Sequence, residues 1–221
     1  MLTATTEADA AAAICAAMRT LEQHDLNRVT AGNVSVRTPN GFLITPSGVK
    51  PAKLTATQMV ALHMSGEPHQ IGARPSSEWR FHCDLYAKRS DCAAVVHVHS
   101  PYATALSCQR RAIPPFHYMI AVAGGDSIRC ADYATFGTQA LADAALSAMT
   151  ERRACLLANH GMIAIGATLE RAVDLALEVE DLARQYLLAC MSGTPVLLSA
   201  AAIADAIEQF KSYGAGDGQI D

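Results

Sequence analysis

The sequence predicts a single α/β domain in which helices cover the faces of a central β-sheet. Apolar runs of strand length recur between longer segments whose apolar residues follow a helical period. The 221 residues are sufficient for one domain with a sizeable core. Because no internal repeat, linker or low-complexity block divides the chain, we expect one domain over residues 1–221, with a flexible C-terminal tail from about residue 212.

The first part of the chain predicts two helices and a pair of strands. Residues 5–25 are rich in alanine and predict the first helix. Residues 32–48 alternate in polarity as two short strands, with Pro39-Asn40-Gly41 as the turn signal between them. Residues 76–89 predict a second helix, for which Ser76 is a plausible N-cap.

The middle of the chain predicts buried strands separated by helices. Residues 92–99 form an apolar run typical of a buried strand, and Ser100-Pro101 after it indicates an N-cap with proline at the first helical position. Residues 128–138 predict a short strand and a loop, and residues 139–149 a helix. Two further strands are expected within residues 154–166.

The strongest helical signal lies in the last third of the chain. Residues 168–191 place their apolar side chains at helical spacing, with Thr168 as the expected cap and Gly193 just beyond the end. A last helix is expected over roughly residues 198–211.

Composition and charge exclude several classes of protein. Apolar residues make up 51% and charged residues 17%, as in an ordinary folded protein. The net charge of -4 gives no general attraction to nucleic acid, and no apolar run is long enough to span a bilayer. Glu7 and Asp9 precede the first apolar segment, and no positive region does, which argues against a secretory signal. We therefore expect a cytoplasmic protein with no nucleic-acid or membrane partner.

The cysteines support the same compartment. Seven are present, which is an odd number, and none forms a CxxC pair. Most lie in apolar runs, so we expect reduced, buried thiols and assign no cysteine to chemistry.

The stretch VVHVHS places His97 and His99 at the end of an apolar strand. Residues two apart on a strand point to the same face, so the two imidazoles project together while Val98 packs the other way. Two such imidazoles can share one metal ion, and two unpaired polar rings at the end of a buried strand would be costly. The alternative is that one ring is a hydrogen-bonded core histidine and the other is exposed.

A metal site needs a third ligand, and the sequence leaves several candidates open. His160 ends the apolar run CLLANH, and Gly161 after it would allow a tight turn that presents the ring. His82 and His117 are competitors. His82 follows Glu78 by four residues on the predicted helix, which suits a packing or supporting role. Glu78 itself is the fourth candidate ligand.

Small and hydroxyl-bearing residues lie at three places where a phosphate could bind. Ser76 and Ser77 precede Glu78 near a predicted helix start, where free N–H groups and the helix dipole attract anions. Gly32-Asn33 and Ser47-Gly48 lie at strand or turn edges that could form an anion nest. Ordinary caps and turns would account for each place alone. No GxGxxG motif opens a helix after a strand, which argues against a nucleotide cofactor.

Taken together, these motifs resemble the class II aldolase/adducin family, most closely its L-fuculose-1-phosphate aldolase branch. The similarity covers roughly residues 25–214 and is carried, in family order, by TAGNVSVR, LITPSG, PSSEWRFH, VVHVHS, IPPFHYMIAVAGGDSI, YATFGT, LLANHGMIA and FKSYG. The resemblance implies a mainly antiparallel central sheet flanked by helices. It also implies a homotetramer with active sites at the subunit interfaces.

The resemblance further implies roles for individual residues. It implies a zinc ion on His97, His99 and His160, with Glu78 beside the metal as the acid/base group. Manganese, iron and cobalt are also compatible with these ligands. Tyr118 would donate and accept a proton from a neighbouring subunit. The implied phosphate ligands are Asn33, Ser47, Gly48, Ser76 and Ser77, and the residues that shape the aldehyde end of the site are Phe136 and Tyr213.

We therefore expect a zinc-dependent aldehyde-lyase that cleaves a ketose 1-phosphate, such as L-fuculose 1-phosphate, to dihydroxyacetone phosphate and lactaldehyde. A metal ion at the ketone would stabilise the charge that develops as the C–C bond breaks. The alternatives are a 5-deoxyribulose 1-phosphate aldolase, or an epimerase, decarboxylase or dehydratase of a sugar phosphate. The segment HYMIAVAGG, which contains Tyr118, favours an aldolase over an epimerase. A non-enzymatic, adducin-like module would lack the ligands, which are all present here.

Overall fold

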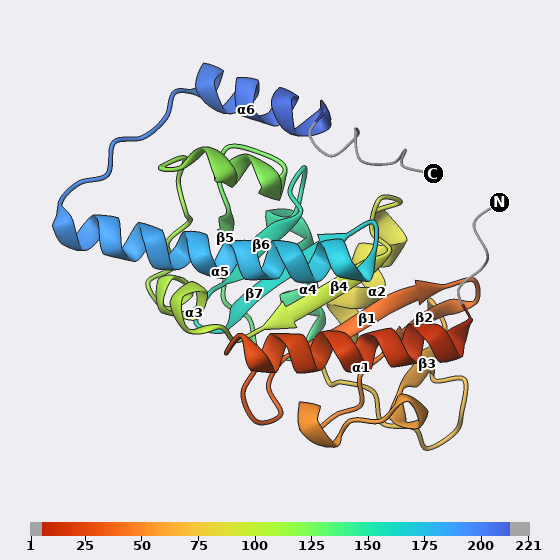
Figure 1. Ribbon diagram of the computed structural model, residues 1–221. Coiled ribbons are helices and arrows are strands. Elements are labelled where there is room, and N and C mark those ends of the chain that lie inside the picture. Colours follow the sequence, from red (N-terminus) through yellow and green to blue (C-terminus); the bar gives the residue numbers. More distant parts are fainter. Residues whose placement is uncertain (1–5, 213–221) are drawn as a thin grey trace, which may run out of the picture.

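Seven strands form one sheet with helices on both faces in the computed structural model, which describes residues 6–212 (Figure 1). The strands are β1 (Asn33–Thr38), β2 (Gly41–Ile44), β3 (Val60–Leu62), β4 (Ala94–Val98), β5 (Arg129–Ala131), β6 (Ala154–Leu157) and β7 (Gly161–Gly166). The α-helices are α1 (Glu7–Gln23), α2 (Trp79–Lys88), α3 (Pro101–Cys108), α4 (Gln139–Ala148), α5 (Leu169–Ser192) and α6 (Ala200–Ser212). The short 3-10 helices are η1 (Pro51–Lys53), η2 (Ala56–Gln58) and η3 (Tyr118–Ala123).

The sheet confirms the expected architecture. Its strand order is β3-β2-β1-β4-β7-β6-β5, and every neighbouring pair is antiparallel except β5 and β6. Pro39-Asn40 forms the turn between β1 and β2, so that Thr38 pairs with Gly41. At the centre, β4 pairs with β1 and β7, and this register places Asn33 directly opposite His97.

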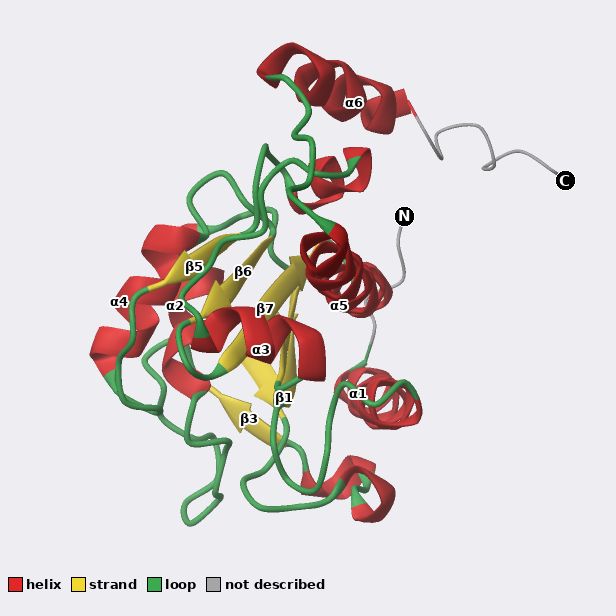
Figure 2. Ribbon diagram, turned by 90° about the vertical axis from the view of Figure 1, so that its left-hand side faces the viewer, coloured by secondary structure: helices red, strands yellow, loops and turns green. Residues whose placement is uncertain are grey.

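Two helical layers cover the sheet. Helices α1, α3 and α5 pack on one face, and α2 and α4 pack on the other (Figure 2). The alternation along β4 supplies both cores, because Val96 and Val98 pack into the first layer and Val95 into the second. His97 shares the direction of Val95 and meets the ring of Phe81 on α2. The histidine pair is therefore built on the face that α2 covers.

Side-chain caps explain where several helices begin. The hydroxyls of Thr6, Thr138 and Thr168 each accept an N–H three residues further on, at the starts of α1, α4 and α5. Helix α3 is capped differently. Ser100 occupies its N-cap position as expected but makes no cap bond. The buried carboxylate of Glu180 on α5 instead accepts two α3 backbone N–H groups at 2.8 Å each.

The prediction that Ser76 caps α2 is wrong. The helix begins at Trp79, and Glu78 holds the N-cap position without a side-chain cap bond. A turn precedes the helix, in which the carbonyl of Ser76 accepts the N–H of Trp79 at 3.2 Å and its hydroxyl accepts the N–H of Glu78 at 3.3 Å. The carboxylate of Glu78 is therefore available to another part of the molecule.

The remaining expectations have mixed outcomes. All seven cysteines are free, but only four are buried: Cys15, Cys83, Cys92 and Cys155 are buried, Cys130 and Cys190 are half-buried, and Cys108 is exposed. Among residues 6–212, no helix has the length and apolar character needed to cross a bilayer. Tyr213 and the predicted tail that follows it lie outside the described residues.

Candidate metal centre and anion pocket

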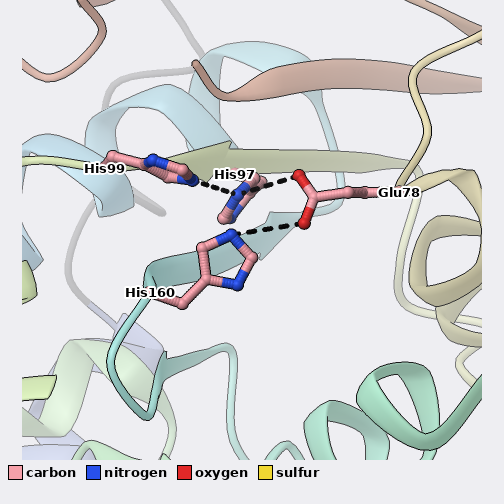
Figure 3. A group of neighbouring side chains, drawn as sticks. All are labelled: Glu78, His97, His99 and His160. Carbon is pink, nitrogen blue, oxygen red and sulfur yellow. Dashed lines mark hydrogen bonds and ion pairs between the residues drawn. The ribbon is translucent and has the colours of Figure 1, made fainter. Parts of the chain in front are cut away.

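Four side chains from three segments of the chain converge at one end of the sheet: Glu78, His97, His99 and His160 (Figure 3). One nitrogen or oxygen from each lies within 4.8 Å of those of the others. Nε2 of His97 lies 3.0 Å from Nε2 of His99 and 3.2 Å from Oε2 of Glu78. Nε2 of His160 lies 3.2 Å from Oε1 of the same carboxylate. The carboxylate and the imidazoles thus share one small volume.

A hydrogen bond on the side of the ring away from the cluster fixes the orientation of His97. Its Nδ1 lies 2.9 Å from the carbonyl oxygen of Met162 on β7, and a carbonyl can only accept a hydrogen bond. Nδ1 therefore carries a proton, and Nε2 faces Glu78 and His99. Metal-ligating histidines typically show this arrangement, with the second nitrogen bound to a backbone carbonyl.

The turn that presents His160 differs in detail from the prediction. Asn159, and not Gly161, takes the left-handed conformation in the loop between β6 and β7, with φ of 56°. Asparagine tolerates this conformation better than most side chains. Gly161 matters for a different reason, because a Cβ there would lie 2.4 Å from the carbonyl oxygen of Val98 and 3.1 Å from Cδ2 of His99. The glycine allows β7 to approach β4 where the ligands meet.

We expect Gly161→Ala to weaken metal binding and to destabilise the fold by about 1–3 kcal/mol, the usual cost of overpacking a filled site. The new methyl group would push β7 away from β4 and displace the ring of His99. Metal titration and urea unfolding measure the two effects. Gly72→Ala is the control, because its Cβ meets nothing within 4 Å, although its φ of 85° still carries strain. Unchanged metal affinity in Gly161→Ala would contradict this account.

The charges in the cluster suit a divalent cation. Burial lowers the pKa of His99 to about 3 and that of His160 to about 4, with nearby His97 adding to both effects. Burial alone would raise the pKa of Glu78, but His97, His160 and a hydrogen bond from Asn33 hold it well below its usual range. Near neutral pH the cluster thus contains the ionised carboxylate of Glu78 and the neutral rings of His99 and His160. Neutral imidazole nitrogens and a carboxylate are electron-pair donors, and such a set fits a metal ion such as zinc.

A pocket of about 310 Å³ opens beside the cluster. It brings together all the residues predicted to bind phosphate, namely Asn33, Ser47, Gly48, Ser76 and Ser77. Glu78, His99 and His160 line the same pocket, so an anionic group held by the serines would lie next to the candidate metal ligands. Phe136, predicted to shape the aldehyde end, also lines it and is 65% exposed.

Some predicted residues lie elsewhere, and some lining residues were not predicted. Tyr118 begins η3, does not line this pocket and stacks against Phe210 of α6 at 6.2 Å between ring centroids. His117 is not part of the cluster. Its Nδ1 accepts the backbone N–H of Met119 in η3. Tyr133 lines the pocket without having been predicted, although it belongs to the same YATFGT segment as Phe136.

His82 lies behind the site. It is fully buried, and its Nε2 lies 2.5 Å from Oδ1 of Asn33. Asn33 in turn donates from Nδ2 to Oε2 of Glu78 at 3.0 Å. His82, which the sequence suggested for a supporting role, is therefore connected to the cluster through the side-chain amide of Asn33.

Acid should destabilise the protein partly through His82, because burial lowers the pKa of this ring from 6.5 to about 3. As pH falls below 6.5, the unfolded chain takes up a proton that the folded protein does not, so stability is lost. We expect this ring to lower the free energy of unfolding by about 2–3 kcal/mol between pH 7 and pH 4.5. Urea unfolding of metal-free wild type and His82→Gln should show a pH dependence that differs by this amount. Equal pH dependence of the two proteins would contradict the prediction.

Known proteins resemble this chain over most of its length. Residues 12–187 match the family described as Class II Aldolase and Adducin N-terminal domain. A 5-methylthioribulose-1-phosphate/5-deoxyribulose-1-phosphate aldolase from Rhodospirillum rubrum is 52% identical, over 86% of this chain and 85% of the relative. An L-fuculose phosphate aldolase from Escherichia coli is 51% identical, over 86% and 88%. The solved structure of an L-fuculose 1-phosphate aldolase, 40% identical, superposes with a TM-score of 0.89 over 92% of this chain and 96% of the other.

Proposed function

The chain belongs to the class II aldolase and adducin family, and from this premise we propose that it is a zinc-dependent lyase that cleaves a ketose 1-phosphate to dihydroxyacetone phosphate and a small aldehyde. The observation that carries the proposal is the convergence of Glu78, His97, His99 and His160 beside a pocket lined by small and hydroxyl-bearing residues. A non-enzymatic, adducin-like module would have no use for this arrangement.

The three imidazoles would hold the metal ion, and the carboxylate of Glu78 would lie beside it. Neutral imidazole nitrogens suit zinc, while manganese, iron and cobalt accept the same donors. When bound, the ion supplies Lewis-acid stabilisation of the negative charge that develops on the substrate oxygens. The hydrogen bond from His97 to the carbonyl of Met162 orients one ligand in advance.

The pocket residues would bind and orient the phosphate. Asn33 offers an amide N–H, Ser47, Ser76 and Ser77 offer hydroxyls, and Gly48 adds no side chain that would fill the space. All five line the pocket that Glu78 also borders. Holding the phosphate there would place the ketone end of the substrate against the metal ligands, and such positioning lowers the barrier to reaction.

Two side chains would move the protons. In cleavage, the proton of the C4 hydroxyl leaves through Tyr118 to solvent, and the bond between C3 and C4 breaks with its electron pair going to C3. Glu78 takes up a proton from solvent during the cycle and passes it to C3. Tyr118 does not line the pocket of its own chain, so it would act in a neighbouring subunit of a homotetramer. Phe136 would shape the aldehyde end of the site. Tyr213, which lies outside the described residues, is proposed for the same role.

L-fuculose 1-phosphate is our first candidate substrate and would yield lactaldehyde. A 5-deoxyribulose 1-phosphate would yield acetaldehyde, because its chain is one carbon shorter beyond the broken bond. This second candidate is favoured by the relative from Rhodospirillum rubrum, which is as similar to this chain as the fuculose phosphate aldolase is. An epimerase, decarboxylase or dehydratase of a sugar phosphate would use the same ligands but would not release dihydroxyacetone phosphate. The free cysteines agree with a reducing compartment, and we propose the cytoplasm.

The decisive experiment measures release of dihydroxyacetone phosphate by the zinc-loaded protein, with and without a chelator. L-fuculose 1-phosphate, 5-deoxyribulose 1-phosphate and 5-methylthioribulose 1-phosphate are compared at equal concentration. Chelator-sensitive release from at least one substrate is expected, and the ratio of kcat/KM values then identifies the preferred aldehyde. Absence of release from all three would contradict the aldolase proposal.

A further inference from the structure

A chain of buried hydrogen bonds runs from the metal-site carboxylate into the core between β1 and α2. Oε2 of Glu78 accepts from Nδ2 of Asn33 at 3.0 Å, and Oδ1 of Asn33 lies 2.5 Å from Nε2 of His82. Nδ1 of His82 lies 2.6 Å from the hydroxyl of Ser35, which lies 2.6 Å from the hydroxyl of Tyr86. Apart from Glu78, each of these side chains is at most 2% exposed.

The chemistry of the groups fixes the direction of every bond in this chain. An ionised carboxylate only accepts, so the amide nitrogen of Asn33 must face Glu78 and the amide oxygen must face His82. Nε2 of His82 must then carry the proton that this oxygen accepts. Nδ1 is left with a lone pair, which accepts from the hydroxyl of Ser35, and Ser35 accepts from Tyr86. All the donors therefore point toward Glu78.

The orientation of Asn33 matters because its side chain lines the anion pocket. One amide N–H goes to Glu78, and the other is left for a group in the pocket. If the amide were reversed, its oxygen would face the carboxylate and no Asn33 N–H would be available to an anion. The carboxylate of Glu78 favours the first orientation from one side of the amide, and a donor at Nε2 of His82 favours the same orientation from the other side.

We propose that His82 is a positioning residue that holds the Asn33 amide with its N–H groups toward Glu78 and the bound substrate anion. The inference rests on the proposed function, since it takes a phosphorylated substrate to occupy the pocket. It goes beyond a packing role because it requires one tautomer of His82, with the proton on Nε2. A ring that only filled space in the core would have no reason to hold this tautomer against the Asn33 oxygen.

The wild-type zinc-loaded protein tests the tautomer directly. In long-range ¹H–¹⁵N spectra of protein labelled at histidine, a nitrogen that carries a proton differs strongly in chemical shift from one that does not. The His82 signals are assigned by their loss in His82→Gln. We expect a neutral ring with the proton on Nε2, and the same state after inorganic phosphate is added. A proton on Nδ1, or an average of the two tautomers, would overturn the proposal.

Two variants of similar size separate positioning from packing. The amide nitrogen of His82→Gln reaches the position of Nε2 and can donate to Asn33, whereas His82→Asn is too short to do so. We expect His82→Asn to weaken binding of inorganic phosphate and to lower kcat/KM by about 10- to 100-fold, as for other groups that orient the residues of a metal site. We expect His82→Gln to restore most of both. Equal losses in the two variants at equal melting temperature would overturn the proposal.

Tyr86→Phe is the matched control within the same chain of bonds. It removes the outermost hydroxyl but leaves the contacts of His82 with Ser35 and Asn33, so kinetic constants close to those of the wild type are expected. A loss as large as that in His82→Asn would show that activity depends on the packing of the core and not on the orientation of the Asn33 amide.

Phosphate binding is measured by calorimetry without substrate. It therefore tests the positioning role even if no ketose phosphate is cleaved, an outcome that would count only against the proposed function.

Discussion

Replacing His99 by alanine is expected to remove the bound metal and to lower kcat/KM for ketose phosphate cleavage by about a thousandfold or more. The estimate follows from the several kcal/mol that a Lewis acid contributes to stabilising developing charge, with each 1.36 kcal/mol worth a factor of ten. Nε2 of His99 lies 3.0 Å from that of His97 and belongs to the only group in residues 6–212 that has the form of a metal site. Metal content per chain and steady-state rates are measured on the same samples.

The control for this prediction is an exposed histidine outside the cluster. The ring of His69 lies at the surface, tilted against that of His63, so His69→Ala should keep a full complement of metal and the wild-type rate. Adding excess zinc to His99→Ala should restore little activity, because the nitrogen that is missing is itself one of the proposed metal ligands. Full activity with stoichiometric metal in His99→Ala would show that His99 is not a ligand.

The sequence predicted the elements whose signals are local. Helix α5 was located to within one residue at each end, because its apolar spacing is regular and Thr168 caps it. Strand β4 was recognised from its apolar run, and the period of two correctly placed the rings of His97 and His99 together. Segment 49–75 carries no regular period, so η1, η2 and β3 were not predicted.

The site was harder to predict because it depends on contacts between distant segments. The residues alone left His82, His117 and His160 open as the third ligand, and the strand pairing decides which ring meets the pair at the end of β4. The cap prediction for Ser76 failed because a turn separates this residue from the helix, and its hydroxyl accepts the N–H of Glu78 before the helix begins. The chain of hydrogen bonds behind Asn33 had a detectable signal. Asn33 and Ser35 alternate on β1, and His82 and Tyr86 lie four apart on α2.

Glu78→Gln is expected to leave the metal bound while lowering kcat by about 100- to 10,000-fold, the usual contribution of a positioned acid/base group. The three imidazoles are unchanged by this replacement, and the amide oxygen of glutamine can still accept from Asn33. What is lost is a carboxyl group that can carry a proton to and from carbon. The expected defect is therefore in proton transfer and not in the assembly of the site.

Exchange of a C3 proton of dihydroxyacetone phosphate with deuterated solvent isolates that step, because it needs no aldehyde and no C–C bond change. We expect the exchange rate in Glu78→Gln to fall by the same factor as cleavage, while metal content stays at the wild-type level. Glu67→Gln, at an exposed position outside the site, is the control and should exchange normally. Rapid exchange by metal-loaded Glu78→Gln would mean that another group moves the proton, and Glu78 would then be a metal ligand without an acid/base role.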